Sequence, residues 1–286
     1  MDLHLGFAGY FAQALALPAS RARRVAALLV DPRWPWPPSW ASFVKEELSK
    51  RTRARKVTGP KGRDHLLAGL TDPTNCMLEM NRSSQEVDNH AHVHAITSRR
   101  PLPAEAEYPF HMTGQTRGHE LPDGASLDAW IELVHELMVA CEVGHAVMPV
   151  WARASTCLSD ISFMRIVVDN RWLPEVDLGP PTDFALENSR ANYWRIELGG
   201  TYVRHPRWGN YLRRDHLQKI GGLDRVRAEV APAAVVDLGD LMFIQLTATP
   251  ATALTAEGEK KRRALANLMA PILPPPRPGE AQELPA

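Results

Sequence analysis

The clearest periodic pattern of apolar and polar positions lies near the middle of the chain, over residues 127–142. Apolar residues recur there at the spacing of one helix face, namely Trp130, Leu133, Val134, Leu137, Met138 and Cys141. Ser126 is a suitable N-cap, and Gly144 can end the helix. Glu132, His135 and Glu136 fall off the apolar face. We therefore predict an amphipathic helix that packs on a sheet and exposes these three polar residues to water.

Shorter patterns predict the remaining elements. Helices are predicted over residues 21–30, 42–50, 211–220, 223–230 and 256–269, the last one capped by Thr255. Strands are predicted over residues 3–11, 76–80, 89–97, 108–113, 163–169 and 193–198, with a hairpin over 234–247 that turns at Leu238-Gly-Asp240. A basic loop is expected over residues 51–63. The apolar run of residues 241–244 is typical of a strand buried on both faces.

The order of these elements indicates the fold class. Helices and strands mix without strict alternation, so we predict an α+β fold of mixed or antiparallel sheets packed by helices, in two halves of similar size. The predicted division is an N-terminal half, residues 1–115, a C-terminal half, residues 116–270, and a Pro-rich tail, residues 271–286, expected to be disordered.

Charge is balanced over the chain but uneven along it. The 286 residues carry 33 Lys and Arg against 33 Asp and Glu, which argues against a general nucleic-acid binder. Residues 1–70 hold 12 basic and 5 acidic side chains, whereas residues 120–190 hold 4 basic and 12 acidic ones. These two regions either face each other, are simply solvated, or meet partners of opposite charge.

Cysteine usage and hydropathy indicate the compartment. Cys76, Cys141 and Cys157 are an odd number without C-x-x-C spacing, which fits a reducing environment. No apolar run is long enough to span a bilayer. We expect a cytoplasmic protein without membrane contact.

Common catalytic motifs are missing from the sequence. It has no phosphate-binding loop, no dinucleotide-binding glycine turn and no nucleophile elbow. His135-Glu136 begins like a zinc-protease helix, but Val139 stands where the second histidine belongs, so we interpret the pair as a solvated helix face. We therefore predict no enzyme activity, no catalytic residue, no metal ligand and no cofactor.

One histidine run supports an alternative. His90, His92 and His94 alternate, so in a strand they share one face, and His111 or His119 could add a third zinc ligand. The same alternation also arises in any half-buried strand with a polar outer face. A zinc-binding protein or metalloenzyme is thus the alternative to a protein without metal.

The C-terminal third carries a resemblance. Trp208 precedes a predicted helix that ends at Gly221-Gly222, and the hairpin, Pro250 and a charged final helix follow. Over roughly residues 120–270 this pattern resembles a bacterial type VI secretion immunity family, some members of which are paired with VRR-Nuc-type nuclease toxins. The chain departs from the family in Gln245-Leu-Thr-Ala-Thr-Pro250, where a Gly-rich turn is expected. The family offers no catalytic residues, and Trp208, Gly221 and Gly222 are interpreted as structural.

The resemblance implies an immunity protein, or antitoxin, that binds a cognate effector toxin and occludes its active site. If the toxin is a nuclease, its cleft is basic, and we expect acidic residues of this chain to bind it. Aromatic residues often anchor such interfaces. The predicted partner-binding residues are Asp169, Trp172, Glu175, Asp177, Asp183, Glu187 and Trp194. An adaptor component of the secretion system is a further alternative, and the oligomeric state is left open.

Overall fold

The computed structural model describes residues 4–11, 17–34, 38–45, 50–81, 93–96, 110–116, 124–151, 203 and 205–273. Within these ranges, no helix combines the length and the apolar character needed to cross a membrane. The predicted strands over 163–169 and 193–198 lie outside the described residues, as does the tail beyond residue 273.

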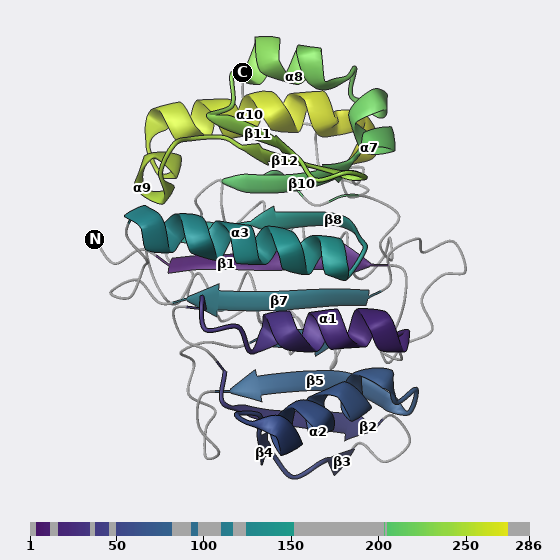
Figure 1. Cartoon of the computed structure of the whole chain (residues 1–286). Helices are drawn as coiled ribbons and strands as arrows, with labels where there is room; N and C mark the ends of the chain where they lie inside the picture. The colour runs from purple at the N-terminus through teal and green to yellow at the C-terminus, as the bar shows by residue number, and fades with distance from the viewer. Residues whose placement is uncertain are drawn as a thin grey trace, which may run out of the picture.

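A single antiparallel sheet organises the described chain (Figure 1). Its strands are β1 His4–Phe11, β2 Trp40–Lys45, β3 Lys50–Arg51, β4 Arg55–Lys56, β5 Asn75–Asn81, β6 Val93–Ile96, β7 Phe110–Thr116, β8 Val143–Met148, β9 Val150–Trp151, β10 Gly209–Arg213, β11 Ala234–Asp237 and β12 Leu241–Gln245. The order across the sheet is β11-β12-β10-β8-β1-β7-β6-β5-β2-β3, with β4 beside β2 and β9 beside β1. Every strand pair is antiparallel. The predicted α+β class is confirmed.

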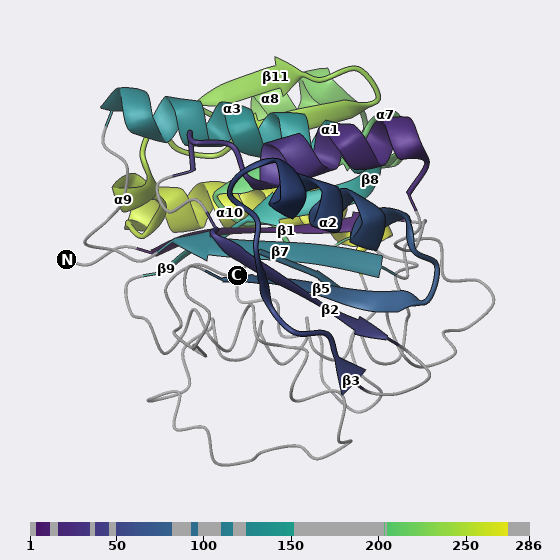
Figure 2. The same cartoon turned by 60° about the horizontal axis from the view of Figure 1, so that its bottom comes forward.

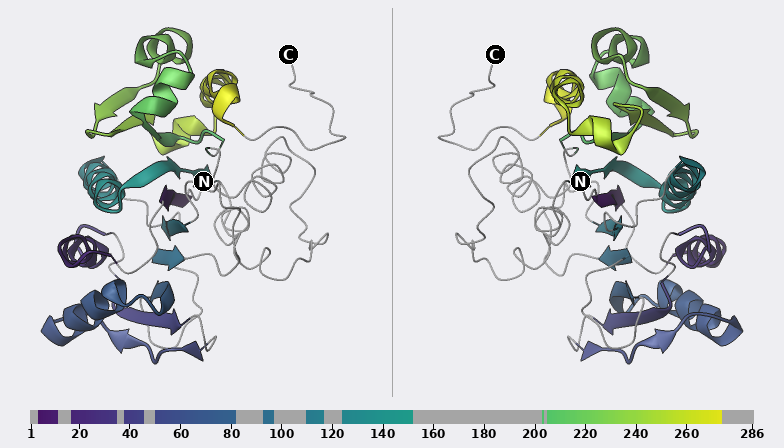
Figure 3. Two further views of the ribbon diagram at one scale, coloured as in Figure 1. Left: turned by 90° about the vertical axis from the view of Figure 1, so that its right-hand side faces the viewer. Right: turned by 90° about the vertical axis from the view of Figure 1, so that its left-hand side faces the viewer.

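Helices cover both faces of this sheet. They are α1 Ala19–Leu29, α2 Pro60–Thr71, α3 Gly124–Ala140, α7 Arg214–Lys219, α8 Leu223–Val230, α9 Pro250–Ala253 and α10 Ala256–Met269, followed by the 3-10 turn η2 Ala270–Ile272. Helices α1, α2 and α3 form one layer over one face (Figure 2), and α10 lies on the opposite face (Figure 3). The larger apolar core fills the space beneath the first layer, and a second core lies under α7, α8 and α10.

Strand β12 separates the two cores. Leu241 and Phe243 belong to the larger core, whereas Met242 and Ile244 belong to the second one. Successive side chains of a strand point to opposite faces, so an apolar run serves both cores. The predicted hairpin and its doubly buried strand are therefore confirmed.

The amphipathic central helix is confirmed, but its ends differ from the prediction. The six apolar residues of its predicted face are all buried. Helix α3 begins at Gly124, so Ser126 lies inside its first turn and is not its N-cap. After the helix, Glu142 takes the left-handed conformation with φ 50°, and Gly144 lies within β8. The turn into β8 is thus made by a charged residue instead of the glycine.

Two predicted helices are wrong because strand pairing overrides local propensity. Residues 42–50 were predicted as helical, but Phe43 pairs opposite Leu78 in the sheet. Residues 211–220 likewise begin as strand β10, in which Tyr211 pairs opposite Phe243, and only α7 is helical. Intrinsic propensity is a weak prior, and a partner strand supplied from distant sequence outweighs it.

Helix α2 begins inside the segment predicted to be a basic loop, residues 51–63, and continues to Thr71. It packs very closely on the sheet because glycines face it. A Cβ at Gly69 would lie 1.9 Å from the Phe43 ring, and one at Gly62 would lie 2.4 Å from the Lys56 carbonyl oxygen. The two glycines therefore allow a short, highly charged helix to lie directly against β2 and β4.

The sheet joins strands from both predicted halves. Strand β1 pairs with β7 on one side and with β8 on the other, and β7 crosses residue 115. The sheet is continuous across the predicted boundary in the described residues. The division into domains at that point stays a prediction.

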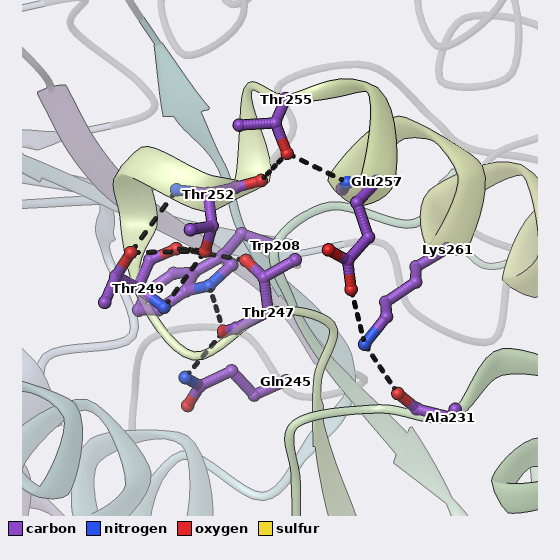
Figure 4. Close-up of polar contacts among 10 residues, drawn as sticks. Trp208, Ala231, Gln245, Thr247, Thr249, Thr252, Thr255, Glu257 and Lys261 are labelled. Carbon is purple, nitrogen blue, oxygen red and sulfur yellow. Dashed lines mark hydrogen bonds and ion pairs between the residues drawn. The ribbon is translucent and has the colours of Figure 1, made fainter.

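Buried and capping hydrogen bonds hold the C-terminal elements together (Figure 4). The Trp208 indole Nε1 donates to the Thr247 carbonyl oxygen at 2.9 Å, which ties the start of β10 to the end of β12. Gly221 and Gly222 have φ of 98° and 89°, a conformation that lets the chain turn from α7 into α8. These contacts fit the structural role predicted for Trp208 and the glycine pair.

The predicted cap of the last helix is also present. The Thr255 hydroxyl oxygen accepts from the Gly258 backbone N–H at 3.3 Å at the start of α10 (Figure 4). We expect Thr255→Ala to lower the free energy of unfolding by about 1 kcal/mol, because an N-terminal backbone donor loses its partner. Urea titration followed by circular dichroism measures the change. Thr255→Ser, which keeps the hydroxyl, is the control, and an equal loss in both variants would contradict the capping role.

Candidate partner-binding surface

The partner-binding residues predicted from sequence lie outside the described residues. These are Asp169, Trp172, Glu175, Asp177, Asp183, Glu187 and Trp194. Their predicted role is therefore still a prediction.

The histidine run is described only in part. His94 lies in β6, opposite Thr113 of β7, and His111 lies opposite Ile96. His90, His92 and His119 are outside the described ranges. Among the residues that are described, no group of three or more His, Cys, Asp or Glu is arranged to hold a metal ion. The zinc alternative thus rests on residues that the structure does not describe.

The described chain presents a large group of exposed cationic side chains on α1, on α2 and around β4. We call these seven residues the basic surface: Arg23, Arg24, Arg53, Arg55, Lys56, Lys61 and Arg63. Helices α1 and α2 lie side by side over the sheet (Figure 2), and the Leu17 backbone N–H donates to the Leu70 carbonyl oxygen at 2.9 Å. Strand β4 leads directly into α2 and pairs with β2. Elements separated in sequence therefore combine to form this surface.

The charges of the basic surface are not compensated within the described chain. None of its seven side chains forms an ion pair with a carboxylate of the described residues, although Asp64 is exposed on α2 nearby. Arg55 is close enough to α2 for its charge to act on His65, whose pKa is lowered first by burial and then by Arg55. Within the described residues, positive charge thus gathers here without a paired carboxylate.

Other arginines of the N-terminal region are paired instead. Arg21 of α1 forms an ion pair with Glu142, just after α3. Arg33 bridges Asp31 at 3.0 Å and Glu136 of α3 at 2.7 Å. Its hydrogen bonds to Asp31 hold the pKa of that carboxyl below its usual range. The basic N-terminal region and the acidic α3 therefore do face each other, as one of the sequence-based alternatives proposed.

Helix α3 contributes the opposite sign to the same layer. Asp128 and Glu132 are exposed and form no ion pair within the described part of the chain. Helix α3 packs beside α1 (Figure 2). The exposed charges of the layer are therefore mainly positive on α2 and α1 and negative on α3. The layer is thus electrostatically polar across its width.

The tryptophans of the described chain divide between core and surface. Trp34 is buried, stacks on Phe7 at 5.8 Å and donates its Nε1 to the Leu28 carbonyl oxygen at 2.7 Å. Trp40 is only half-buried and pairs opposite Lys56 in the β2–β4 ladder. Trp40 is therefore the described tryptophan that lies next to the basic surface.

A buried histidine–tyrosine pair was missed by the sequence prediction. His135 was expected in water, but its Nδ1 lies 2.8 Å from the Tyr211 hydroxyl and its ring contacts Phe243 at 4.4 Å. Burial lowers the pKa of His135 to about 4 and raises that of Tyr211 well above its usual value. Both groups are neutral at pH 7. No periodicity signal distinguishes a half-buried helix flank from a solvated one, which explains the error.

The buried thiol of Cys141 is held in its protonated form. Burial raises the pKa of the Cys141 thiol to about 12, so the reactive thiolate is scarce at neutral pH. Cys141 is therefore a core residue of α3's buried face.

Comparison with known proteins shows what the fold is similar to. No family model and no curated protein sequence matches the chain. A solved structure, the T6SS protein PA0821 of Pseudomonas aeruginosa, is similar with a TM-score of 0.55 at 13% sequence identity. The match covers 95% of this chain and 76% of that one. The likeness establishes a shared fold.

Proposed function

We propose that the protein is an immunity protein of a type VI secretion system, which binds a cognate effector toxin and blocks the toxin's active site. The observation that carries the proposal is the fold shared with a T6SS protein over 95% of the chain. The sequence resemblance over residues 120–270 points the same way. An exposed charged surface without ion pairs to other described residues supports a role in binding a protein.

The proposal includes a mode of action. Inhibition by occlusion is stoichiometric and needs no catalytic residue, cofactor or metal from the inhibitor. We also propose a cytoplasmic location, since a toxin would act there on the cell that makes it. If the toxin is a nuclease, the five carboxylates between residues 169 and 187 are the proposed complement of its basic cleft.

Co-expression tests the function. The protein is produced in a sensitive host together with each flanking gene product, and growth is followed. We expect rescue from one of these products and a stable complex of the two proteins by gel filtration. Protection should saturate at one protein per toxin. Protection at far lower ratios would indicate enzymatic inactivation and contradict the proposal, as would no rescue at all.

Two further measurements separate the alternatives. Metal analysis of untagged protein is expected to show less than stoichiometric zinc, and one bound zinc per chain would favour the histidine-strand alternative. Stable binding to an apparatus component instead of a toxin would indicate an adaptor of the secretion system.

Reversing the five acidic charges is expected to weaken toxin binding, and unchanged affinity would remove those residues from the interface.

A further inference from the structure

We propose that the basic surface on α1, α2 and around β4 is a docking site for an acidic surface of the protein partner. This inference rests on the proposed function and assigns a part of the interface that the acidic residues 169–187 do not include. The partner is defined by chemistry: a folded protein whose carboxylates face Arg55, Lys61 and Arg63.

The first observation behind the proposal is the distribution of charge. Seven exposed cationic side chains lie on adjoining elements, whereas Arg21 and Arg33 nearby are neutralised by carboxylates. Uncompensated like charges repel one another, and a partner of opposite charge removes that repulsion and accelerates encounter. Five of the seven are arginines, whose planar fork binds carboxylates through two hydrogen bonds.

The backbone beneath the surface is held firmly, which is the second step. Helix α2 lies on the sheet through Gly62 and Gly69, and the His65 ring packs edge-on against Phe43 at 5.5 Å. Phe43 itself is buried. A rigid support reduces the ordering cost of binding, because only the side-chain ends must be fixed.

The limited extent of the basic surface favours a protein partner over a nucleic acid. The positive charges end at α3, where Asp128 and Glu132 are exposed without ion pairs in the described chain. A long polyanion crossing the layer would meet these carboxylates, whereas a bounded acidic surface of a folded protein would not. Arg23 and Arg24 are exposed on α1, which lies between α2 and α3 (Figure 2), and they mark the transition. The change of sign also orients the partner across the layer.

Charge reversal tests the assignment in the full-length protein. The test variant is Arg55→Glu/Lys61→Glu/Arg63→Glu. The control is Lys219→Glu/Arg227→Glu/Lys260→Glu, which changes the net charge equally at exposed positions of α7, α8 and α10. Affinity for the toxin that co-purifies with wild type is measured by calorimetry, and binding to a DNA duplex is measured in parallel. Circular dichroism checks that each variant folds. If charge reversal prevents folding, Arg55→Gln/Lys61→Gln/Arg63→Gln replaces the test variant.

We expect the test variant to lose at least about tenfold in toxin affinity and the control to keep the wild-type value. Equal affinity in both variants would overturn the assignment and leave the proposed function intact. A loss of duplex binding with unchanged toxin affinity would assign the surface to nucleic acid and overturn it as well. The absence of any toxin complex with wild type would overturn the proposed function, and this inference with it.

Discussion

Replacing Trp130 with alanine is expected to lower the free energy of unfolding by about 3–5 kcal/mol, the largest effect that we predict. Trp130 is fully buried on the inner side of α3 and is among the largest side chains of the larger core. Truncation removes the apolar contacts of the indole and leaves a cavity that the surrounding helices and strands fill only partly. Urea titration followed by far-ultraviolet circular dichroism measures the loss without relying on tryptophan fluorescence.

Trp130→Phe is the matched control for this substitution. The indole Nε1 of Trp130 is buried and has no hydrogen-bond partner in the described chain, and such a donor costs stability. Phenylalanine retains most of the ring and removes this donor. We therefore expect it to cost about 1 kcal/mol or less, since the relieved donor offsets part of the lost volume. A phenylalanine variant as unstable as the alanine variant would show that the indole nitrogen has a partner.

Patterns that depend on neighbours in sequence predicted the fold best. The buried face of α3, the hairpin of β11 and β12, and the cap of α10 are local features, and the structure confirms all three. Each depends on spacing within one or two elements. Their physical cause is therefore visible in the sequence itself.

Elements that depend on distant partners were predicted poorly. Strand β2 looked helical because Lys45 and the residues after it favour helices, yet Phe43 is fixed by β5 and by α2 above it. The first residues of helix α2 were predicted as part of a basic loop over residues 51–63, and no element was predicted for the rest of the helix. In the fold, Gly62 instead allows the close contact with β4. Tertiary packing decided both segments, and a single sequence does not reveal that packing.

The candidate surface was predictable only as a charge imbalance. The excess of basic residues in the first 70 positions left open whether these charges pair within the fold, are solvated or meet a partner. The fold makes that distinction by placing α3 beside α1, where Glu136 and Glu142 pair with Arg33 and Arg21, whereas the basic surface has no paired carboxylate among the described residues. Which basic residues are paired therefore depends on which helices become neighbours on the sheet.

Lowering the pH from 7 to 5 is expected to destabilise the protein by about 2 kcal/mol through His135 alone. Burial lowers the pKa of His135 from 6.5 to about 4, so the folded state keeps the imidazole neutral. The unfolded chain takes up a proton as the pH falls through 6.5, which favours unfolding. The stabilising contribution is therefore complete above pH 6.5 and is lost progressively toward pH 4.

His135→Asn isolates this contribution. Asparagine places a polar atom near the position of Nδ1, so it keeps a partner for the Tyr211 hydroxyl, but it does not titrate. Urea titrations at pH 5 and pH 7 should show a smaller difference in the variant than in wild type. A residual dependence of the same sign is expected from His65, whose pKa burial also lowers. An unchanged pH dependence would mean that His135 titrates as it does in water, and would contradict its burial between α3 and β10.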